Sequence, residues 1–69
     1  MPKFSERLKE LRIGKGLTQQ QLANATGISQ NAIAFWENEK RIPIIIAVVK
    51  LADYFNVSVD YLVGRTDDC

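Results

Sequence analysis

Residues 18–37 constrain the fold of this 69-residue chain more than any other segment does. Apolar residues recur there every three to four positions, which is the period of one buried helical face and not that of a strand. Gly27 stands where the chain must turn with a positive φ angle, which costs little only for glycine. Ala23 is small enough to let two helices cross closely. The segment is therefore predicted to form two short helices joined by a turn, with Leu22, Ile28, Ile33 and Trp36 facing inward.

Capping residues indicate where the other helices begin. Thr18 and Gln21 form a capping-box pattern, and Ser29 and Ser58 each precede a further helical segment. Pro43 interrupts helical structure, and a fourth helix is predicted to follow it. The sequence thus predicts a compact all-α fold of five helices, at residues 4–15, 19–26, 30–38, 45–55 and 59–63.

The helix predicted at residues 45–55 should bury one apolar stripe against the rest of the chain. We expect this stripe to consist of Ile45, Val48 or Val49, Leu51, Ala52 and Phe55. Residues 1–64 are expected to form one domain. Residues 65–69 are polar and are expected to be a frayed tail.

Composition argues against an enzyme, a metal site and a cofactor. The chain has no histidine and one cysteine, Cys69, so it lacks the residues that most zinc sites and most acid–base catalysts need. Cys69 cannot form an internal disulfide, and we expect a free thiol without a role. The longest apolar run, residues 42–49, contains Pro43 and is too short to cross a bilayer, and no signal peptide is recognised. A protein of the reducing cytoplasm, without a membrane or metal partner, is expected.

Charge is distributed unevenly, although the formal net charge is only +1. Basic residues are frequent in the first 15 residues and follow the central segment as Lys40 and Arg41. Acidic residues gather in the last third of the chain. This asymmetry predicts a basic side and an acidic side.

The helix predicted at residues 30–38 has an outward face that suits DNA. With Ile33 and Trp36 turned inward, the outward residues are Gln30, Asn31, Ala34 and Phe35. Glutamine and asparagine amides carry a donor and an acceptor, which match N6 and N7 of adenine in the major groove. The first turn of such a helix is the part that meets base edges. The alternative is that Gln30 and Asn31 are ordinary solvated residues that follow a helix cap.

The chain resembles the Cro/repressor-type (XRE-like) helix-turn-helix family of phage and bacterial regulators. Its matching segments, in the order of the family, are residues 4–12 (FSERLKELR), 15–19 (KGLTQ), 22–23 (LA), 27–29 (GIS), 33, 36–38 (WEN), 40–41 (KR), 43, 51–58 (LADYFNVS) and 60–62 (DYL). The resemblance implies a lambda-repressor-like DNA-binding domain of five helices. It also implies a transcriptional regulator, most simply a repressor, that binds a palindromic double-stranded operator as a homodimer.

The same resemblance assigns roles to individual residues. It implies base contacts from Gln19, Gln30, Asn31 and Phe35, and phosphate contacts from Arg12, Thr18, Lys40 and Arg41. The alternative for the basic residues is an ordinary solvated charge. Glu37 is expected to form an ion pair with Arg12, because a carboxylate near phosphates is repulsive. Trp36 is expected to lie in the core and not to act as a stacking platform.

Two positions depart from the family pattern close to the expected DNA face. Glu39 stands where family members often have glycine, so either Glu39 adopts the left-handed conformation or Asn38 takes that role. Phe35 replaces a residue that is usually polar. Its ring is expected either to touch a thymine methyl group or to pack sideways on a neighbour.

The run Ile44–Ile45–Ile46 is a third departure. Ile45 alone is needed for the core, and Ile44 stands where the family commonly has a small polar cap. Similar repressors dimerise through the loop before the fourth helix and through residues around the fifth, so the resemblance implies a self-complementary dimer patch made of Ile44, Ile46, Val59 and Tyr61. One alternative is that the domain itself buries Ile44 or Ile46. Another is an antitoxin or immunity-type protein that uses this patch to bind a different partner, and a third is a DNA-binding domain cut from a longer regulator.

Overall fold

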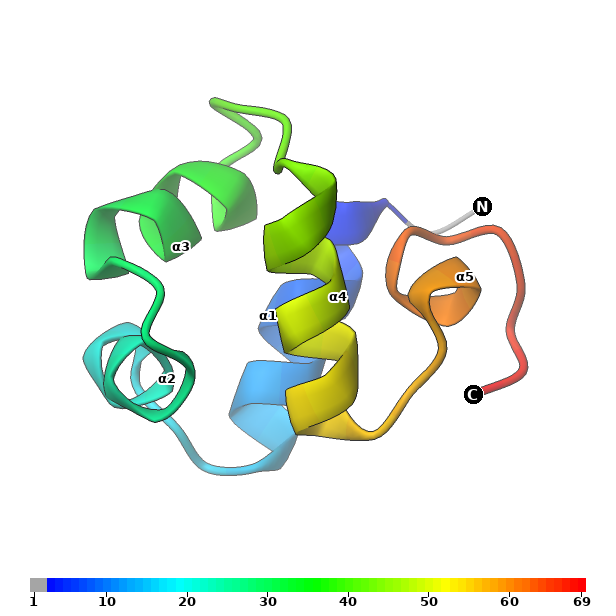
Figure 1. Cartoon of the computed structure of the whole chain (residues 1–69), viewed down its shortest axis with the longest axis horizontal. Helices are drawn as coiled ribbons and strands as arrows, with labels where there is room; N and C mark the ends of the chain where they lie inside the picture. The colour runs from blue at the N-terminus through cyan, green and yellow to red at the C-terminus, as the bar shows by residue number, and fades with distance from the viewer. Residues whose placement is uncertain (1–2) are drawn as a thin grey trace.

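Five helices form in the order and at the places that the sequence predicts. The computed structural model describes residues 3–69, and Figure 1 shows the helices around one core. They are α1 (Phe4–Gly14), α2 (Gln19–Thr26), α3 (Gln30–Glu37), α4 (Ile45–Phe55) and α5 (Val59–Leu62). Three of them end one residue earlier than predicted, and no strand occurs among residues 3–69. The predicted all-α fold is confirmed.

Side-chain caps begin three of the helices. The Thr18 hydroxyl accepts a hydrogen bond from Gln21 N at 3.1 Å, and the Gln21 side chain accepts one from Thr18 N at 2.8 Å. Ser29 and Ser58 each accept a hydrogen bond from the backbone three residues later, at 3.1 and 3.0 Å. Each cap satisfies a backbone N–H group that the first turn of a helix leaves without a partner. At the end of α2, Gly27 has a φ of 75°, as its place in the turn requires.

The core lies between the five helices. Its members are Leu8, Leu22, Ala23, Ile33, Trp36, Ala47, Val48, Leu51, Ala52, Phe55 and Leu62. The predicted stripe on α4 is confirmed for Leu51, Ala52 and Phe55, and Val48 is its member in place of Val49.

The prediction of a buried Ile45 is wrong, because this side chain is 66% exposed. Successive residues of an α-helix point about 100° apart. Ile44, Ile45 and Ile46 are all exposed, so the N-cap and the first two residues of α4 stand outside the core. The burial of α4 starts two residues after Ile45, at Ala47.

Glu39 itself adopts the left-handed conformation, with a φ of 60°, while Asn38 has a φ of −94°. The first of the two alternatives for this turn is therefore correct. The Glu39 carboxylate lies 3.0 Å from the Lys3 ammonium, and both side chains are more than half exposed. Such an ion pair adds little stability, so it does not offset the backbone strain.

Replacing Glu39 with glycine should raise the free energy of unfolding by about 1 kcal/mol, because glycine adopts a positive φ without the clash of a Cβ atom. Urea denaturation followed by circular dichroism measures the change. Asn38→Gly is the matched control one residue earlier, where φ is negative and glycine should destabilise the domain. Equal effects at the two positions would contradict the explanation.

The C-terminal tail is not frayed, contrary to the prediction. The Arg7 guanidinium donates a hydrogen bond to Asp67 at 2.6 Å and lies 3.9 Å from the centre of the Tyr61 ring. Ser58 N donates to the carbonyl oxygen of Cys69 at 3.0 Å. Arg7 is only 5% exposed, so its buried charge needs this acidic partner, and the polar tail supplies it.

The helices are arranged so that α2 and α3 form one side of the molecule. In Figure 1, α1 and α4 lie in the middle, and α5 and the C-terminus lie on the opposite side. Within residues 3–69, none of the helices has the length and apolarity needed to cross a membrane. The same residues contain no group of three or more histidine, cysteine, aspartate or glutamate side chains that could hold a metal ion.

Candidate nucleic-acid interface

The paired helices α2 and α3 are held together by small and apolar side chains. Leu22 and Ile33 are fully buried between them, and Ala23 is buried beside them, which confirms the predicted inward face. Ile28 is half-buried against the same core. Trp36 is also buried, and the Phe4 ring packs on it edge-to-face with the centroids 6.1 Å apart. The prediction that Trp36 belongs to the core is confirmed.

An ion pair joins α1 to the end of α3. Arg12 Nε donates a hydrogen bond to Glu37 Oε2 at 2.7 Å, and Arg12 Nη2 donates one to Glu37 Oε1 at 3.0 Å, so the ion pair is bidentate. The exposed fractions of the two side chains are 13% and 3%. The hydrogen bonds to Glu37 raise the pKa of Arg12 above its ordinary value. The predicted pairing of Glu37 with Arg12 is confirmed.

Two glutamine side chains extend this ion pair to the surface. Gln19 Nε2 donates to Glu37 at 3.2 Å, and Gln30 Nε2 donates to Gln19 Oε1 at 2.9 Å. A carboxylate has only acceptors, so Glu37 determines which end of the Gln19 amide faces it. The orientation of Gln19 in turn determines which end of Gln30 faces inward. We call the connected side chains of Arg12, Glu37, Gln19 and Gln30 the amide relay.

Among residues 3–69, the Gln30 side chain makes no hydrogen bond other than the one to Gln19, so its oxygen and its second N–H remain available. These are the acceptor and the donor that pair with N6 and N7 of adenine. The sequence predicted the two glutamines as separate contacts and missed the bonds between them. One signal in the sequence could have indicated these bonds. A carboxylate such as Glu37 can accept more hydrogen bonds than a single arginine donates to it, so a further donor is expected nearby.

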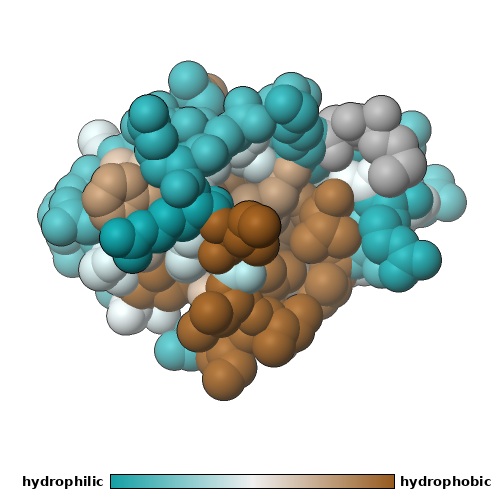
Figure 2. Space-filling model, turned by 90° about the horizontal axis from the view of Figure 1, so that it is seen from above, coloured by the Kyte–Doolittle hydropathy of each residue, from teal (hydrophilic) through white to brown (hydrophobic). Residues whose placement is uncertain are grey.

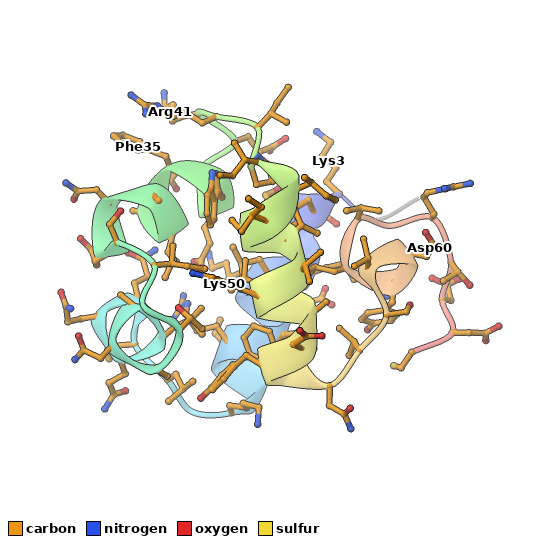
Figure 3. All side chains as sticks on the ribbon, viewed as in Figure 1. Lys3, Phe35, Arg41, Lys50 and Asp60 are labelled. Atoms are coloured by element: carbon orange, nitrogen blue, oxygen red, sulfur yellow. The ribbon has the colours of Figure 1, made fainter. Side chains whose placement is uncertain are left out.

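Phe35 and Arg41 lie together on the outer side of α3 (Figure 3). The Phe35 side chain is 38% exposed, and the Arg41 guanidinium lies 4.8 Å from the centre of its ring. Lys40 N donates to the carbonyl oxygen of Phe35 at 2.8 Å, which holds the turn after α3 against the helix. The sideways neighbour expected for Phe35 is therefore Arg41. Asn31 is exposed one turn earlier on the same helix.

The side chains predicted to contact phosphates have different surroundings. Lys40 and Arg41 are exposed, whereas Arg12 is held in the amide relay and also donates from Nη1 to the carbonyl oxygen of Leu17 at 2.7 Å. Nη1 and Nη2 of Arg12 each retain a second N–H group. The Thr18 hydroxyl accepts from Gln21 N and can still donate its own proton. All four contacts stay predictions. Figure 3 shows Arg41 over α3 and Asp60 at the far end of the molecule, where Arg65 lies 3.7 Å from it.

Apolar side chains gather on the surface around the start of α4, as Figure 2 shows. Ile44 is 68% exposed and Ile46 is 65% exposed, so the alternative in which the domain buries one of them is wrong. Val59 and Tyr61, the other residues of the predicted dimer patch, are half-buried. The name isoleucine patch is used below for the exposed residues Ile42, Ile44, Ile45, Ile46 and Val49.

Residues 8–62 match the model of a family described as Helix-turn-helix. The chain belongs to the Cro/repressor-type helix-turn-helix family. The matched segment contains the whole of α2, α3, α4 and α5, the amide relay and most of α1.

Relatives of the chain in the family include regulators of bacterial genes. The chain is 40% identical over 65 residues to the uncharacterized HTH-type transcriptional regulator YobD of Bacillus subtilis, covering 94% of this chain and 58% of YobD. It is 39% identical over 61 residues to the HTH-type transcriptional activator BcrR of Enterococcus faecalis, covering 88% of this chain and 30% of BcrR. The chain therefore spans between about a third and three fifths of the length of these relatives.

A solved helix-turn-helix structure matches nearly the whole fold. The restriction-modification controller protein C.AhdI from Aeromonas hydrophila superposes with a TM-score of 0.78 at 32% sequence identity. The match covers 86% of this chain and 89% of that protein. Because the superposition covers most of both chains, the arrangement of helices is shared and not only the paired motif.

Proposed function

We propose that this chain binds double-stranded DNA in a sequence-specific manner and regulates transcription, as a repressor, from a palindromic operator. In this proposal α3 enters the major groove, and Gln19, Gln30, Asn31 and Phe35 contact base edges. Thr18, Lys40, Arg41 and the remaining N–H groups of Arg12 contact phosphates. Repression needs only that the bound protein occupies the operator.

The amide relay is the observation that carries this proposal. A free glutamine samples many rotamers, and ordering it on DNA costs conformational entropy. Gln30 is ordered beforehand by Gln19, which is itself held by a buried carboxylate. A pre-ordered amide at the start of an outward helix is suited to reading a base. Each well-formed bidentate contact between an amide and a base contributes about 1–3 kcal/mol of discrimination against the wrong base.

The proposed regulator acts as a homodimer, in which the isoleucine patch provides the contact together with the exposed edges of Val59 and Tyr61. A two-fold dimer places the same surface on both sides of its axis. Its two α3 helices should then lie about 34 Å apart, one turn of DNA, so that each half of a palindrome is read in the same way.

Selection of binding sites from a random double-stranded DNA pool tests the proposed function. The wild type should enrich a palindrome, and Gln30→Ala/Asn31→Ala should lose this sequence while keeping its circular dichroism spectrum. Gln20→Ala/Asn24→Ala is the matched control, because it removes the same two residue types from an exposed pair on α2. The control should enrich the same palindrome as the wild type.

Two outcomes would contradict the proposal in different ways. Enrichment of no sequence by folded wild-type protein would favour the antitoxin or immunity-type alternative, with the isoleucine patch as the binding surface for another protein. If Gln30→Ala/Asn31→Ala still recognises the enriched site, residues other than Gln30 and Asn31 determine the base specificity. A reporter gene with the selected site between its promoter and coding sequence then separates repression from activation.

A further inference from the structure

Phe35 is the large apolar side chain among the outward residues of α3, which also include the amides Gln30 and Asn31. It follows Asn31 by four residues, so the two side chains lie on the same side of the helix. The ring cannot form a conventional hydrogen bond, yet it remains partly exposed on the surface that, by the proposed function, faces the major groove.

The Phe35 ring is held in place by its surroundings. The Arg41 guanidinium covers one face of the ring at 4.8 Å, an arrangement in which the cation is attracted to the aromatic electrons. The hydrogen bond from Lys40 N to Phe35 O fixes the turn that carries Arg41. Figure 3 shows the Phe35 side chain pointing away from α4 and α5, so the uncovered part of the ring is directed outward.

One apolar group is available to such a ring in the major groove, the 5-methyl group of thymine. We propose that Phe35 reads the 5-methyl group of a pyrimidine and thereby makes binding depend on thymine rather than on uracil at one position of each half-site. This inference rests on the proposed function. Four residues of α-helix rise about 6 Å, so the thymine lies within about two base pairs of the base that Asn31 contacts.

Replacement of thymine by uracil tests the inference because it removes the methyl group and leaves every hydrogen-bonding group of the base unchanged. Duplexes of the selected operator, with deoxyuridine at one symmetry-related pair of thymines at a time, are titrated with the protein by fluorescence anisotropy. One such substitution should raise the dissociation constant of the wild type by roughly threefold to fivefold per half-site, which is the effect expected from the loss of one buried methyl group. Phe35→Ala should bind the thymine and uracil duplexes equally well.

Two further variants separate methyl reading from a general role of the ring. Phe35→Leu keeps an apolar side chain and should retain part of the preference for thymine. Lys40→Ala removes a neighbouring charge and should weaken binding to both duplexes by the same factor. Circular dichroism checks that each variant is folded.

The outcomes distinguish this inference from the proposed function. If the wild type binds its selected operator but binds every uracil duplex equally well, the inference is overturned and the proposed function stands. The inference is also overturned if Phe35→Ala weakens binding to both duplexes and keeps the preference for thymine, since the ring would then only support Arg41. A wild type that binds no sequence specifically would overturn both.

Discussion

Replacing Glu37 with glutamine should lower the free energy of unfolding by about 3 kcal/mol, because it leaves the mostly buried Arg12 guanidinium without a counter-charge. The glutamine side chain has the same shape, but its NH₂ group turns a donor toward donors of Arg12 or Gln19. A domain of this size has a small margin of stability, so the loss is a large fraction of the total. Urea denaturation followed by circular dichroism measures it.

Glu39→Gln is the matched control for this experiment. It makes the same chemical change in the ion pair with Lys3, whose two side chains are more than half exposed, and it should alter stability little. Equal effects of the two substitutions would show that burial does not determine the contribution of the Arg12–Glu37 pair. A second readout is DNA binding, because Glu37→Gln also removes the acceptor that orients Gln19 and Gln30 in the amide relay.

Replacing Ile44 with serine should change folding and self-association in opposite directions. Ile44 occupies the N-cap position of α4 with φ and ψ angles of −76° and 155°, close to those of the serine cap at Ser58. A serine there can accept a hydrogen bond that isoleucine cannot, and should stabilise the monomer by about 1 kcal/mol. The same change removes an apolar side chain from both copies in a two-fold interface. It should weaken the dimer by about 3 kcal/mol, or roughly a hundredfold in the dissociation constant.

Sedimentation equilibrium over a range of concentrations, without DNA, measures the dimer. The gain in stability is measured at a concentration where both proteins are monomeric, because association itself stabilises the folded state. Ile13→Ser is the control, since Ile13 is an exposed isoleucine that lies on α1 beside Lys9 and Glu10. A wild type that stays monomeric, or an Ile13→Ser variant that weakens association as much as Ile44→Ser, would contradict a dimer through the isoleucine patch.

Local chemistry made much of this fold predictable. The caps at Thr18, Ser29 and Ser58 and the turn at Gly27 depend on residues close in sequence, so their signals can be read without knowing the tertiary structure. The pairing of Arg12 with Glu37 was predictable for another reason. A carboxylate on a helix that is expected to face DNA requires a nearby cation, and the family pattern supplies one on the first helix.

The errors share a different physical origin. Helical periodicity gives the direction of a buried stripe but not where other helices stop covering it, which is why Ile45 was placed in the core. The tail was predicted to be frayed because its partner, Arg7, lies 60 residues away in sequence. The bonds of the amide relay were missed for the same reason, because the positions of Gln19 and Gln30 relative to Glu37 depend on how three helices cross.

The position of Cys69 makes this protein convenient to label. It is the single cysteine of the chain, and its thiol is free and exposed. The tail that carries it is tied to the start of α5, across α1 and α4 from α2 and α3 (Figure 1). A maleimide dye attached there sits far from α3 and needs no engineered thiol. Fluorescence from the unmodified sequence can therefore follow DNA binding without altering the surface of α3.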